Sequence, residues 1–349
     1  MHRVLVLCLL LPACVAPAPT PRVVASSAHA LAASNGHTLI LTDLDAVTEA
    51  GALAFDGEPI PFPDEPDNNT GIPRGLPPAA AIAVGSRHAC LLSAGEVTCW
   101  GDHIHGALGA HRTCPSPTDC VLGPELMPTL PPIRAIAAGD DVTCATAEGG
   151  EVMCWGKAGA RLGGSIVSAL APPVPVMTSP GQPLHAARVM IRDTTVCAID
   201  GYQQAWCWGG AYGASPSHLD LTGVVDLSIN ADHGCAVAST GLTCWGHNIN
   251  GQVDPDQAAD CKDGCALAST PVPLAATRVV VGARHTCALD DHGDVWCWGD
   301  NEDGQLARTD AFLVGARDLA FAGAIELAAG ARHTCAIAAD HTAWCWGKN

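Results

Sequence analysis

Cysteine, histidine and tryptophan residues gather in two nearly identical stretches of this sequence. One reads GARHTCALDDHGDVWCWGDN, from Gly282 to Asn301, and the other reads GARHTCAIAADHTAWCWGKN, from Gly330 to Asn349. Each places a histidine two residues before a cysteine and sets a second cysteine between two tryptophans. These residue types could form a disulfide, ligate a metal, or provide a thiol nucleophile. The elements that position the side chains decide among these chemistries.

The same pattern recurs along the whole chain. Four further copies with paired cysteines begin at Gly85, Gly139, Thr195 and Asp232. A degenerate copy aligns from Arg22, with Leu31 and Leu41 in the places of the cysteines. In the seven units, the aligned histidine position falls at His29, His88, Val142, Val196, His233, His285 and His333. The average spacing of about 50 residues is typical of propeller blades or solenoids.

Each unit is expected to form short β-strands. A β-branched run such as Arg278–Gly282 leads into the H-x-C run, a Gly/Asp/Asn turn follows, and a third run ends in C-W-G. A weaker fourth run carries prolines, as in Thr270–Leu274, which suits an edge strand. No stretch shows a convincing helical period. We therefore predict an all-β protein, a seven-bladed β-propeller over residues 22–349 with about four antiparallel strands per blade.

Opposed residues in an antiparallel hairpin lie about 4.5 to 5.5 Å apart, within reach of a disulfide. Six hairpin disulfides are predicted: Cys90 with Cys99, Cys144 with Cys154, Cys197 with Cys207, Cys235 with Cys244, Cys287 with Cys297, and Cys335 with Cys345. Two loops carry their own pairs, Cys114 with Cys120 and Cys261 with Cys265. With Cys8 and Cys14 near the N-terminus, these account for all 18 cysteines and leave none as a nucleophile. Successive hairpin pairs belong to different blades and do not converge as zinc ligands would, so no metal or cofactor is expected.

The tryptophans and histidines are expected to be structural. All nine tryptophans lie in the C-W-G run or two residues before it, and the following glycine allows a bend or a close backbone approach. A ring of imidazoles near the axis could bind a metal. Val142 and Val196 interrupt the aligned series, however, which favours a structural histidine.

The N-terminus predicts export. Residues 1–13 contain a basic start and a short apolar run, Val4–Leu11, that is too short to span a bilayer. The stretch LPAC, Leu11–Cys14, resembles a bacterial lipobox, which implies a lipid on Cys14 and an extended Pro/Ala-rich tether over residues 14–21. Val15 after the cysteine then indicates the outer membrane. The alternative is ordinary secretion with cleavage nearby, to the periplasm or the medium.

The string G-x-x-H-[ST]-C-A-[LI] followed by W-G-x-N-x-x-G-Q resembles the regulator of chromosome condensation repeat. It is found in Gly282–Leu306 and, in its second half, in Cys244–Gln252. The resemblance covers Arg22 to Asn349 and implies a seven-bladed propeller, here a secreted, cysteine-rich bacterial variant. The family's eukaryotic founder is a nucleotide exchange factor for a nuclear GTPase and binds chromatin, and a secreted bacterial relative inhibits β-lactamase.

The acidic charge of the chain and its predicted export argue against nucleotide-exchange activity and chromatin binding. With 17 basic and 35 acidic residues, the chain has a formal charge of -18 and should not bind nucleic acid. Exchange-factor activity is therefore the least favoured function. So many cysteines also suit an oxidising compartment better than the cytosol.

We expect a non-catalytic, monomeric propeller that binds a protein or glycan at the cell envelope. The alternative is a polysaccharide lyase or hydrolase, which would need two carboxylates across a bond; acidic clusters occur at Phe62–Asp67 and Asp290–Asp294. Long insertions follow the third run of four units, and we expect them to gather on one side of the ring and receive the partner. They are Thr42–Pro78, Asp102–Pro132, Lys157–Pro183 and His247–Pro273.

Overall fold

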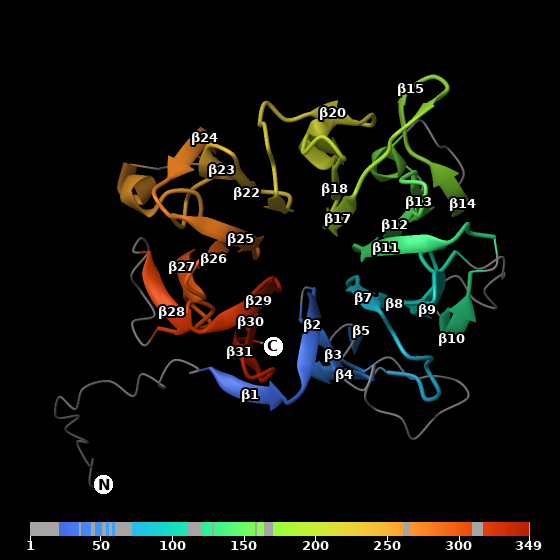
Figure 1. Ribbon diagram of the computed structural model, residues 1–349, viewed down its shortest axis with the longest axis horizontal. Coiled ribbons are helices and arrows are strands. Elements are labelled where there is room, and N and C mark those ends of the chain that lie inside the picture. Colours follow the sequence, from blue (N-terminus) through green and yellow to red (C-terminus); the bar gives the residue numbers. More distant parts are fainter. Residues whose placement is uncertain are drawn as a thin grey trace, which may run out of the picture.

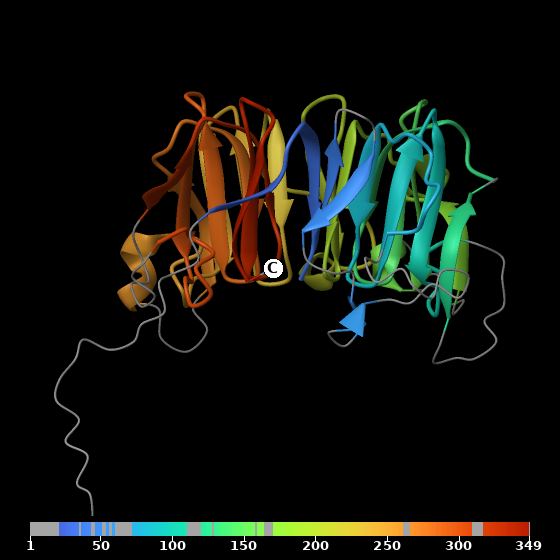
Figure 2. The same ribbon diagram turned by 90° about the horizontal axis from the view of Figure 1, so that it is seen from below.

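The computed structural model describes residues 21–34, 36–42, 46–50, 54–55, 58–59, 72–109, 120–127, 129–157, 159–163, 170–260, 266–308 and 317–348. Within them, antiparallel sheets are arranged as seven blades around a common axis (Figure 1). Seen from the side, the ring is a disc with two faces (Figure 2). The prediction of an all-β, seven-bladed propeller is confirmed.

The described part of the chain gives six blades four strands and one blade three. Blade 1 contains β2 (Ala28–Ala33), β3 (Thr38–Thr42) and β4 (Val47–Ala50). Blade 2 contains β7 (Ala81–Val84), β8 (His88–Ser93), β9 (Glu96–Asp102) and β10 (Val121–Leu126). Blade 3 contains β11 (Ile133–Ala138), β12 (Val142–Ala147), β13 (Val152–Lys157) and β14 (Leu170–Pro175). Blade 4 contains β17 (Arg188–Arg192), β18 (Thr195–Ile199), β19 (Ala205–Gly209) and β20 (Ser217–His218).

The remaining blades follow the same plan. Blade 5 contains β21 (Asp226–Ile229), β22 (His233–Ala238), β23 (Gly241–His247) and β24 (Ala266–Val272). Blade 6 contains β25 (Ala276–Val281), β26 (His285–Asp290), β27 (Asp294–Gly299) and β28 (Asp318–Ala322). Blade 7 contains β29 (Ala324–Ala329), β30 (His333–Ala338), β31 (Ala343–Gly347) and β1 (Arg22–Ala25). Two small hairpins, β5 (Ala54–Phe55) with β6 (Glu58–Pro59) and β15 (Met177–Ser179) with β16 (Gln182–Pro183), lie between blades.

Three 3₁₀ turns complete the secondary structure of the described residues. They are η1 (Ala160–Leu162), η2 (Gly210–Tyr212) and η3 (Pro255–Asp260). No helix in this part of the chain has the length and apolar character needed to cross a membrane.

The ring is closed by strands from the two ends of the chain. β1 pairs antiparallel with β31, with Arg22 opposite Cys345 and Ala25 opposite Ala343, and completes the sheet β1-β31-β30-β29. The N-terminal segment therefore supplies the fourth strand of blade 7. The predicted leader and tether, with Cys8 and Cys14, lie almost entirely outside the described residues.

The two faces of the ring differ in their connections. Because strands alternate in direction, the first and third strands of a blade end on the same face, and the third-to-fourth connections leave there. We name this the insertion face, and the other, which carries the turns between second and third strands, the hairpin face. The hairpin turns are short, as at residues 94–95 and 239–240, whereas residues 103–120 and 248–265 join third to fourth strands.

The apolar core lies between blades. The buried apolar residues among those described form seven clusters, one at each interface between neighbouring blades. At the interface of blades 5 and 6, for example, Val237 and Val253 pack with Trp298. A single blade cannot bury its two faces alone, so these clusters hold the ring together.

The alignment of the first unit from the sequence was wrong. The backbone bond from Ser34 N to His37 O matches those from Gly85 to His88 and from Gly282 to His285. His37, not the exposed His29 of β2, therefore holds the histidine position. The places of the two cysteines belong to Leu39 and Glu49, which oppose each other across β3 and β4, rather than to Leu31 and Leu41.

A second position also needs correction. Thr195 opposes Gly209 as His285 opposes Gly299, so Thr195 and not Val196 holds the histidine position of blade 4. Val142, opposite Gly156, holds this position in blade 3, as predicted.

Candidate functional site

The second and third strands of six blades are joined by disulfides. The six predicted hairpin pairs are bonded, with S–S distances between 1.96 and 2.11 Å and Cα–Cα distances between 4.0 and 4.2 Å. Cys120 is also disulfide-bonded, whereas its predicted partner Cys114 and the pair Cys261 and Cys265 lie outside the described residues. Every described cysteine is oxidised, so none of them offers a thiol nucleophile.

Buried histidines link four of the blades to the next blade through a threonine. Their Nε2 atoms lie 2.8 to 3.0 Å from Thr Oγ1 atoms in the pairs His88 with Thr143, His233 with Thr286, His285 with Thr334, and His333 with Thr38. Thr286 donates its own proton to the carbonyl of Gln252, at 2.7 Å, so its oxygen accepts from the imidazole. This arrangement assigns the tautomer with the proton on Nε2. The histidines therefore fix neighbouring blades and have no geometry for a shared metal.

Five buried histidines, named here the histidine belt, are neutral because they are buried. They are His37, His88, His233, His285 and His333. Burial lowers the pKa of His37 and His88 to about 4, and that of His233, His285 and His333 to about 3. Desolvation penalises the protonated form, and the threonine partners carry no charge to offset it. Among the described residues, His37 Nε2 has no hydrogen-bond partner, since blade 2 has Ala89 where blades 1, 3, 6 and 7 have threonine.

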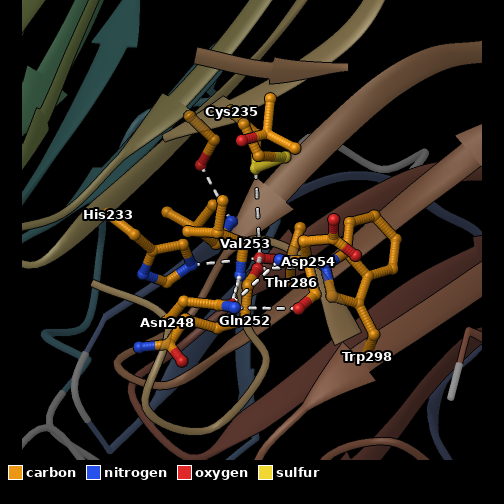
Figure 3. Close-up of a disulfide and its surroundings, with 12 residues drawn as sticks. His233, Cys235, Asn248, Gln252, Val253, Asp254, Thr286 and Trp298 are labelled. Atoms are coloured by element: carbon orange, nitrogen blue, oxygen red, sulfur yellow. Dashed lines mark hydrogen bonds between the residues drawn. A yellow bond between two sulfur atoms is a disulfide. The ribbon is translucent and has the colours of Figure 1, made fainter. Parts of the chain in front are cut away.

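A turn on the insertion face is hydrogen-bonded to the following blade. We name this contact, from a backbone carbonyl of the turn to a threonine and a tryptophan of the next blade, the lock. Gln252, in the turn after β23, places its carbonyl oxygen 2.7 Å from Thr286 Oγ1 and 3.0 Å from Trp298 Nε1 (Figure 3). Asn248 shapes this turn, because its Oδ1 accepts from the backbone N–H of Val253 and of Asp254. The N-x-x-G-Q motif is thus an anchor for the neighbouring blade.

The same lock recurs at two other interfaces. Gln305 O accepts from Trp346 Nε1 and from Thr334 Oγ1. Ala107 O likewise accepts from Trp155 Nε1 and Thr143 Oγ1, both at 2.8 Å. The Ala107 contacts use only the carbonyl, so this lock does not require a glutamine side chain.

The glycine after each C-W pair is required by a close backbone approach. Gly299 has φ +104°, and a Cβ there would clash with the carbonyl of Arg284 and the Cα of His285. The expectation of a bend or close approach at this position agrees with this geometry.

The centre of the ring is bridged by one side chain. Arg192, at the end of inner strand β17, donates from Nη2 to the carbonyl oxygens of Val281, at 3.0 Å, and of Ala329. These acceptors belong to blades 6 and 7, across the axis from blade 4. Arg192 therefore obstructs the axial opening as a route for a ligand.

The acidic cluster at Asp290–Asp294 forms the turn between β26 and β27, and Asp290 is engaged within it. Asp290 Oδ1 accepts from the backbone N–H of His292 and Asp294, and its Oδ2 accepts from Trp296 Nε1, each at 2.9 Å. Asp200 caps the corresponding turn of blade 4 and binds Trp206 in the same way. The other cluster, Phe62–Asp67, lies outside the described residues.

The insertions predicted to gather on one side do so only in part. The segments that follow β4, β9, β13 and β23 leave on the insertion face, where η3 projects from the disc in Figure 2. The hairpin β15–β16, within the Lys157–Pro183 insertion, follows β14 and lies at the opposite end of the blade, where His185 bridges to Glu151. This part of the insertion belongs to the hairpin face.

An apolar pocket of about 350 Å³ opens between blades 4 and 5. It is lined by Tyr212, Leu219, Leu221, Trp245, Leu267 and Ala268, with Asp220, Gly246 and Ser269 also contributing. This pocket was not predicted from the sequence. One feature of the sequence indicated it, because no counterpart of the turn Asn248–Gln252 follows Gly209.

Comparisons with known proteins agree with this fold. The Regulator of chromosome condensation (RCC1) repeat matches residues 276–305 and 324–349. Human E3 ubiquitin-protein ligase HERC2 is 27% identical over 254 residues, 64% of this chain and 5% of HERC2. The Ultraviolet-B receptor UVR8 of Arabidopsis thaliana is 28% identical over 244 residues, 64% of this chain and 54% of UVR8. The chain thus spans at most about half of these two relatives.

Solved structures give the same propeller. Human WBSCR16 superposes with a TM-score of 0.71 at 15% identity, covering 93% of this chain and 88% of that one. Prp20p from Saccharomyces cerevisiae, studied for its binding to Gsp1p and histones, superposes with a TM-score of 0.69 at 20% identity, covering 91% and 81%. Likeness at this identity establishes the fold alone. The repeat match, the curated relatives and the seven-bladed architecture together support the regulator of chromosome condensation repeat family for this chain.

Proposed function

We propose that this chain is a non-catalytic, protein-binding propeller whose partner docks on the insertion face. The observation that carries this proposal is the contrast between the two faces. Connections such as residues 103–120 and 248–265 leave on the insertion face, whereas second and third strands are joined by short turns on the hairpin face. Loops held at fixed points of a rigid scaffold are a common way to build a recognition surface.

The roots of these loops are rigid. Ala107 and Gln252, each in the first part of an insertion, are hydrogen-bonded to a buried tryptophan of the next blade. Disulfides join the second and third strands of six blades, and Cys120 adds one at the base of the 103–120 connection. Rigid anchoring lowers the entropy lost when a partner orders a loop.

The described groups support binding over catalysis. The apolar pocket contains a single carboxylate, Asp220, whereas glycoside cleavage would use two across a bond. Asp290 is engaged in its turn, and four of the five histidines of the histidine belt are hydrogen-bonded to a threonine. These observations make the alternative, a polysaccharide lyase or hydrolase, the weaker proposal.

We further propose that the protein works outside the cytosol, held at the cell envelope through Cys14 and a short tether. The oxidised hairpin pairs support an oxidising compartment. The acidic charge makes nucleic acid an unfavourable partner. Because likeness to Prp20p carries the fold alone, exchange-factor activity is not part of this proposal.

The test is loop replacement followed by partner capture. Residues 111–119 and, separately, residues 261–265 are replaced by Gly-Ser linkers in the full chain, and proteins captured from envelope extracts are identified by mass spectrometry. We expect each replacement to weaken capture of a reproducibly identified partner at least tenfold while thermal unfolding is unchanged. The control replaces Asp291 and His292 of a hairpin-face turn with Gly-Ser and should retain capture. Retention in both loop variants, with loss in the control, would move the interface to the hairpin face.

A further inference from the structure

The tryptophan of one C-W-G run is not buried like the others. Its counterparts Trp100, Trp155, Trp208, Trp298 and Trp346 are at most 2% exposed. Trp245, in blade 5, is only half-buried and lines the apolar pocket.

The chain itself covers the other tryptophans. At four interfaces, a buried aliphatic side chain from the preceding blade's insertion packs into the cluster that contains the tryptophan. These are Leu108 with Trp155, Leu162 with Trp208, Val253 with Trp298, and Leu306 with Trp346. Each of these side chains is at most 1% exposed. The fold therefore has a site for one aliphatic side chain beside the tryptophan at four of its seven interfaces.

Between blades 4 and 5, both the turn that supplies the carbonyl and the threonine that donates to it are missing. The connection from β19 to β20 spans only residues 210–216 and contains no counterpart of the turn formed by Asn248–Gln252. On the other side, Gly234 stands opposite Trp245, where blade 6 has Thr286 opposite Trp298. A Cβ at Gly234 would clash with the Trp245 indole, so the ring lies directly against this backbone.

Tyr212 replaces only part of the missing turn. Trp245 Nε1 donates to the Tyr212 hydroxyl at 2.9 Å, as its counterparts donate to a backbone carbonyl. No aliphatic side chain of the described residues fills the adjoining space, which remains a pocket of about 350 Å³. Since the Tyr212 oxygen accepts this bond, its own proton is available to a carbonyl at the pocket.

We propose that this pocket, named here the Trp245 pocket, binds an aliphatic side chain carried on a turn of the partner protein. The partner would supply the side chain that the chain itself supplies at four other interfaces, together with a backbone carbonyl for the Tyr212 hydroxyl. This inference rests on the proposed protein-binding function and assigns it one anchor point. Central, desolvated apolar anchors of this kind carry a large share of interface affinity.

The volume suits this occupant. The pocket is at the lower end of the range for ligand sites, about 300 to 1,000 Å³, and its lining is chiefly leucine, alanine and aromatic surface. Ala268 and Ser269 at its mouth are exposed, so a side chain can enter from solvent.

The probe is a peptide with the sequence of the turn that contains Gln305 and Leu306. NEDGQLAR, residues 301–308 with blocked ends, is titrated into the full oxidised protein while the nine indole N–H resonances are followed by NMR. We expect the Trp245 resonance, assigned with Trp245→Phe, to shift with a dissociation constant on the order of 1 mM, as for one small anchor. The Trp298 resonance should not move, because the chain's own Val253 already fills the space beside that ring. A peptide with alanine in place of leucine should bind at least tenfold more weakly.

Two variants of the protein complete the test. Ala268→Trp should block the pocket and abolish the Trp245 shift, while the matched control Ala266→Trp, exposed on the same strand but outside the lining, should leave it unchanged. Tyr212→Phe should weaken binding roughly two- to tenfold by removing one hydrogen bond. Thermal unfolding and the other indole resonances check that each variant is folded.

Several outcomes would overturn the inference. A partner's aliphatic anchor would be rejected if the alanine peptide bound as tightly as the leucine peptide. It would also be rejected if Ala268→Trp bound the peptide like the wild type, or if the free protein self-associated through the pocket. If an identified partner is captured equally by wild type and Ala268→Trp, the Trp245 pocket is refuted while the binding function stands. If no partner is captured but the peptide binds as expected, the binding function is the part that fails.

Discussion

Acid should destabilise this propeller steeply, because five histidines are buried and neutral in the folded state. Burial lowers the pKa of His37 and His88 to about 4, and that of His233, His285 and His333 to about 3, from 6.5. The folded pKa lies below the unfolded pKa, so unfolding takes up protons. The stability is therefore complete above about pH 6.5 and is lost progressively as the pH falls toward 3 to 4.

The size of the effect follows from proton uptake. Between pH 7 and pH 5 the unfolded imidazole becomes almost fully protonated while the folded one stays neutral, which costs about 2 kcal/mol per histidine. Five such residues give about 9 kcal/mol, comparable with the whole free energy of unfolding of a typical domain, about 5 to 15 kcal/mol. Near pH 5.5 the free energy of unfolding should fall by about 6 kcal/mol per pH unit.

A single substitution isolates one histidine. His285→Val introduces the residue that the chain already has at the equivalent Val142. It should lower absolute stability by leaving a cavity, and it should reduce the pH slope from about 6 to about 5 kcal/mol per pH unit, since one fewer proton is taken up. The control is His292→Gln, whose ring is exposed and whose loss should leave the slope unchanged.

The assay is guanidinium unfolding of the oxidised protein, followed by tryptophan fluorescence at half-unit steps from pH 7.5 to 4.5. The slope is compared among the wild type, His285→Val and His292→Gln. A wild-type stability that is flat between pH 7 and pH 5, or an unchanged slope in His285→Val, would refute the argument from buried neutral histidines.

Four shorter predictions follow from the same structure. Thiol titration of the unreduced, denatured protein should find no free cysteine beyond those of the N-terminal segment, and replacing Cys287 and Cys297 together by alanine should destabilise the protein by about 2 to 3 kcal/mol; reactive thiols in the wild type would contradict the pairing. Removal of residues 1–25 deletes β1 and should lower the unfolding temperature by more than the removal of residues 1–20, and equal values would mean that β1 does not close the ring. Cys14→Ser should lose membrane fractionation, while fractionation like the wild type would leave secretion or another anchor. Duplex DNA at low salt should show no micromolar binding, and such binding would contradict the charge argument.

The strands and disulfides could be predicted because the sequence repeats their pattern. A cysteine on each of two strands, separated by a turn, fixes which residues oppose each other, and all six hairpins follow this rule. In the unit that lacks the paired cysteines, the register was predicted wrongly. In the first unit AHALAA imitates H-x-C closely enough to favour His29 over His37, and no cysteine corrects it. A strand shifted by an even number of residues, as from His29 to His37, keeps each side chain on the same face, so alternation alone does not settle the register.

The Trp245 pocket could not be predicted for a different reason. The short connection after Gly209 and the glycine at position 234 are visible in the sequence, but each is unremarkable by itself. Their combined effect appears only when blades 4 and 5 are set side by side, because both changes remove material from the same interface. The obstruction by Arg192 likewise depends on carbonyls 89 and 137 residues further along the chain.

The pairing of β1 with β31 has a consequence for the order of folding. Six disulfides each join cysteines only 9 or 10 residues apart, so a blade can be cross-linked as soon as its own strands have formed. The final sheet instead joins Ala25 to Ala343, and loop closure over such a length is slow and needs the complete chain. A polypeptide halted before residue 343 would hold oxidised blades in an open arc with unpaired strand edges, a form prone to aggregation. Pairing of β1 with β31 is thus the step that separates an open, aggregation-prone arc from the closed ring.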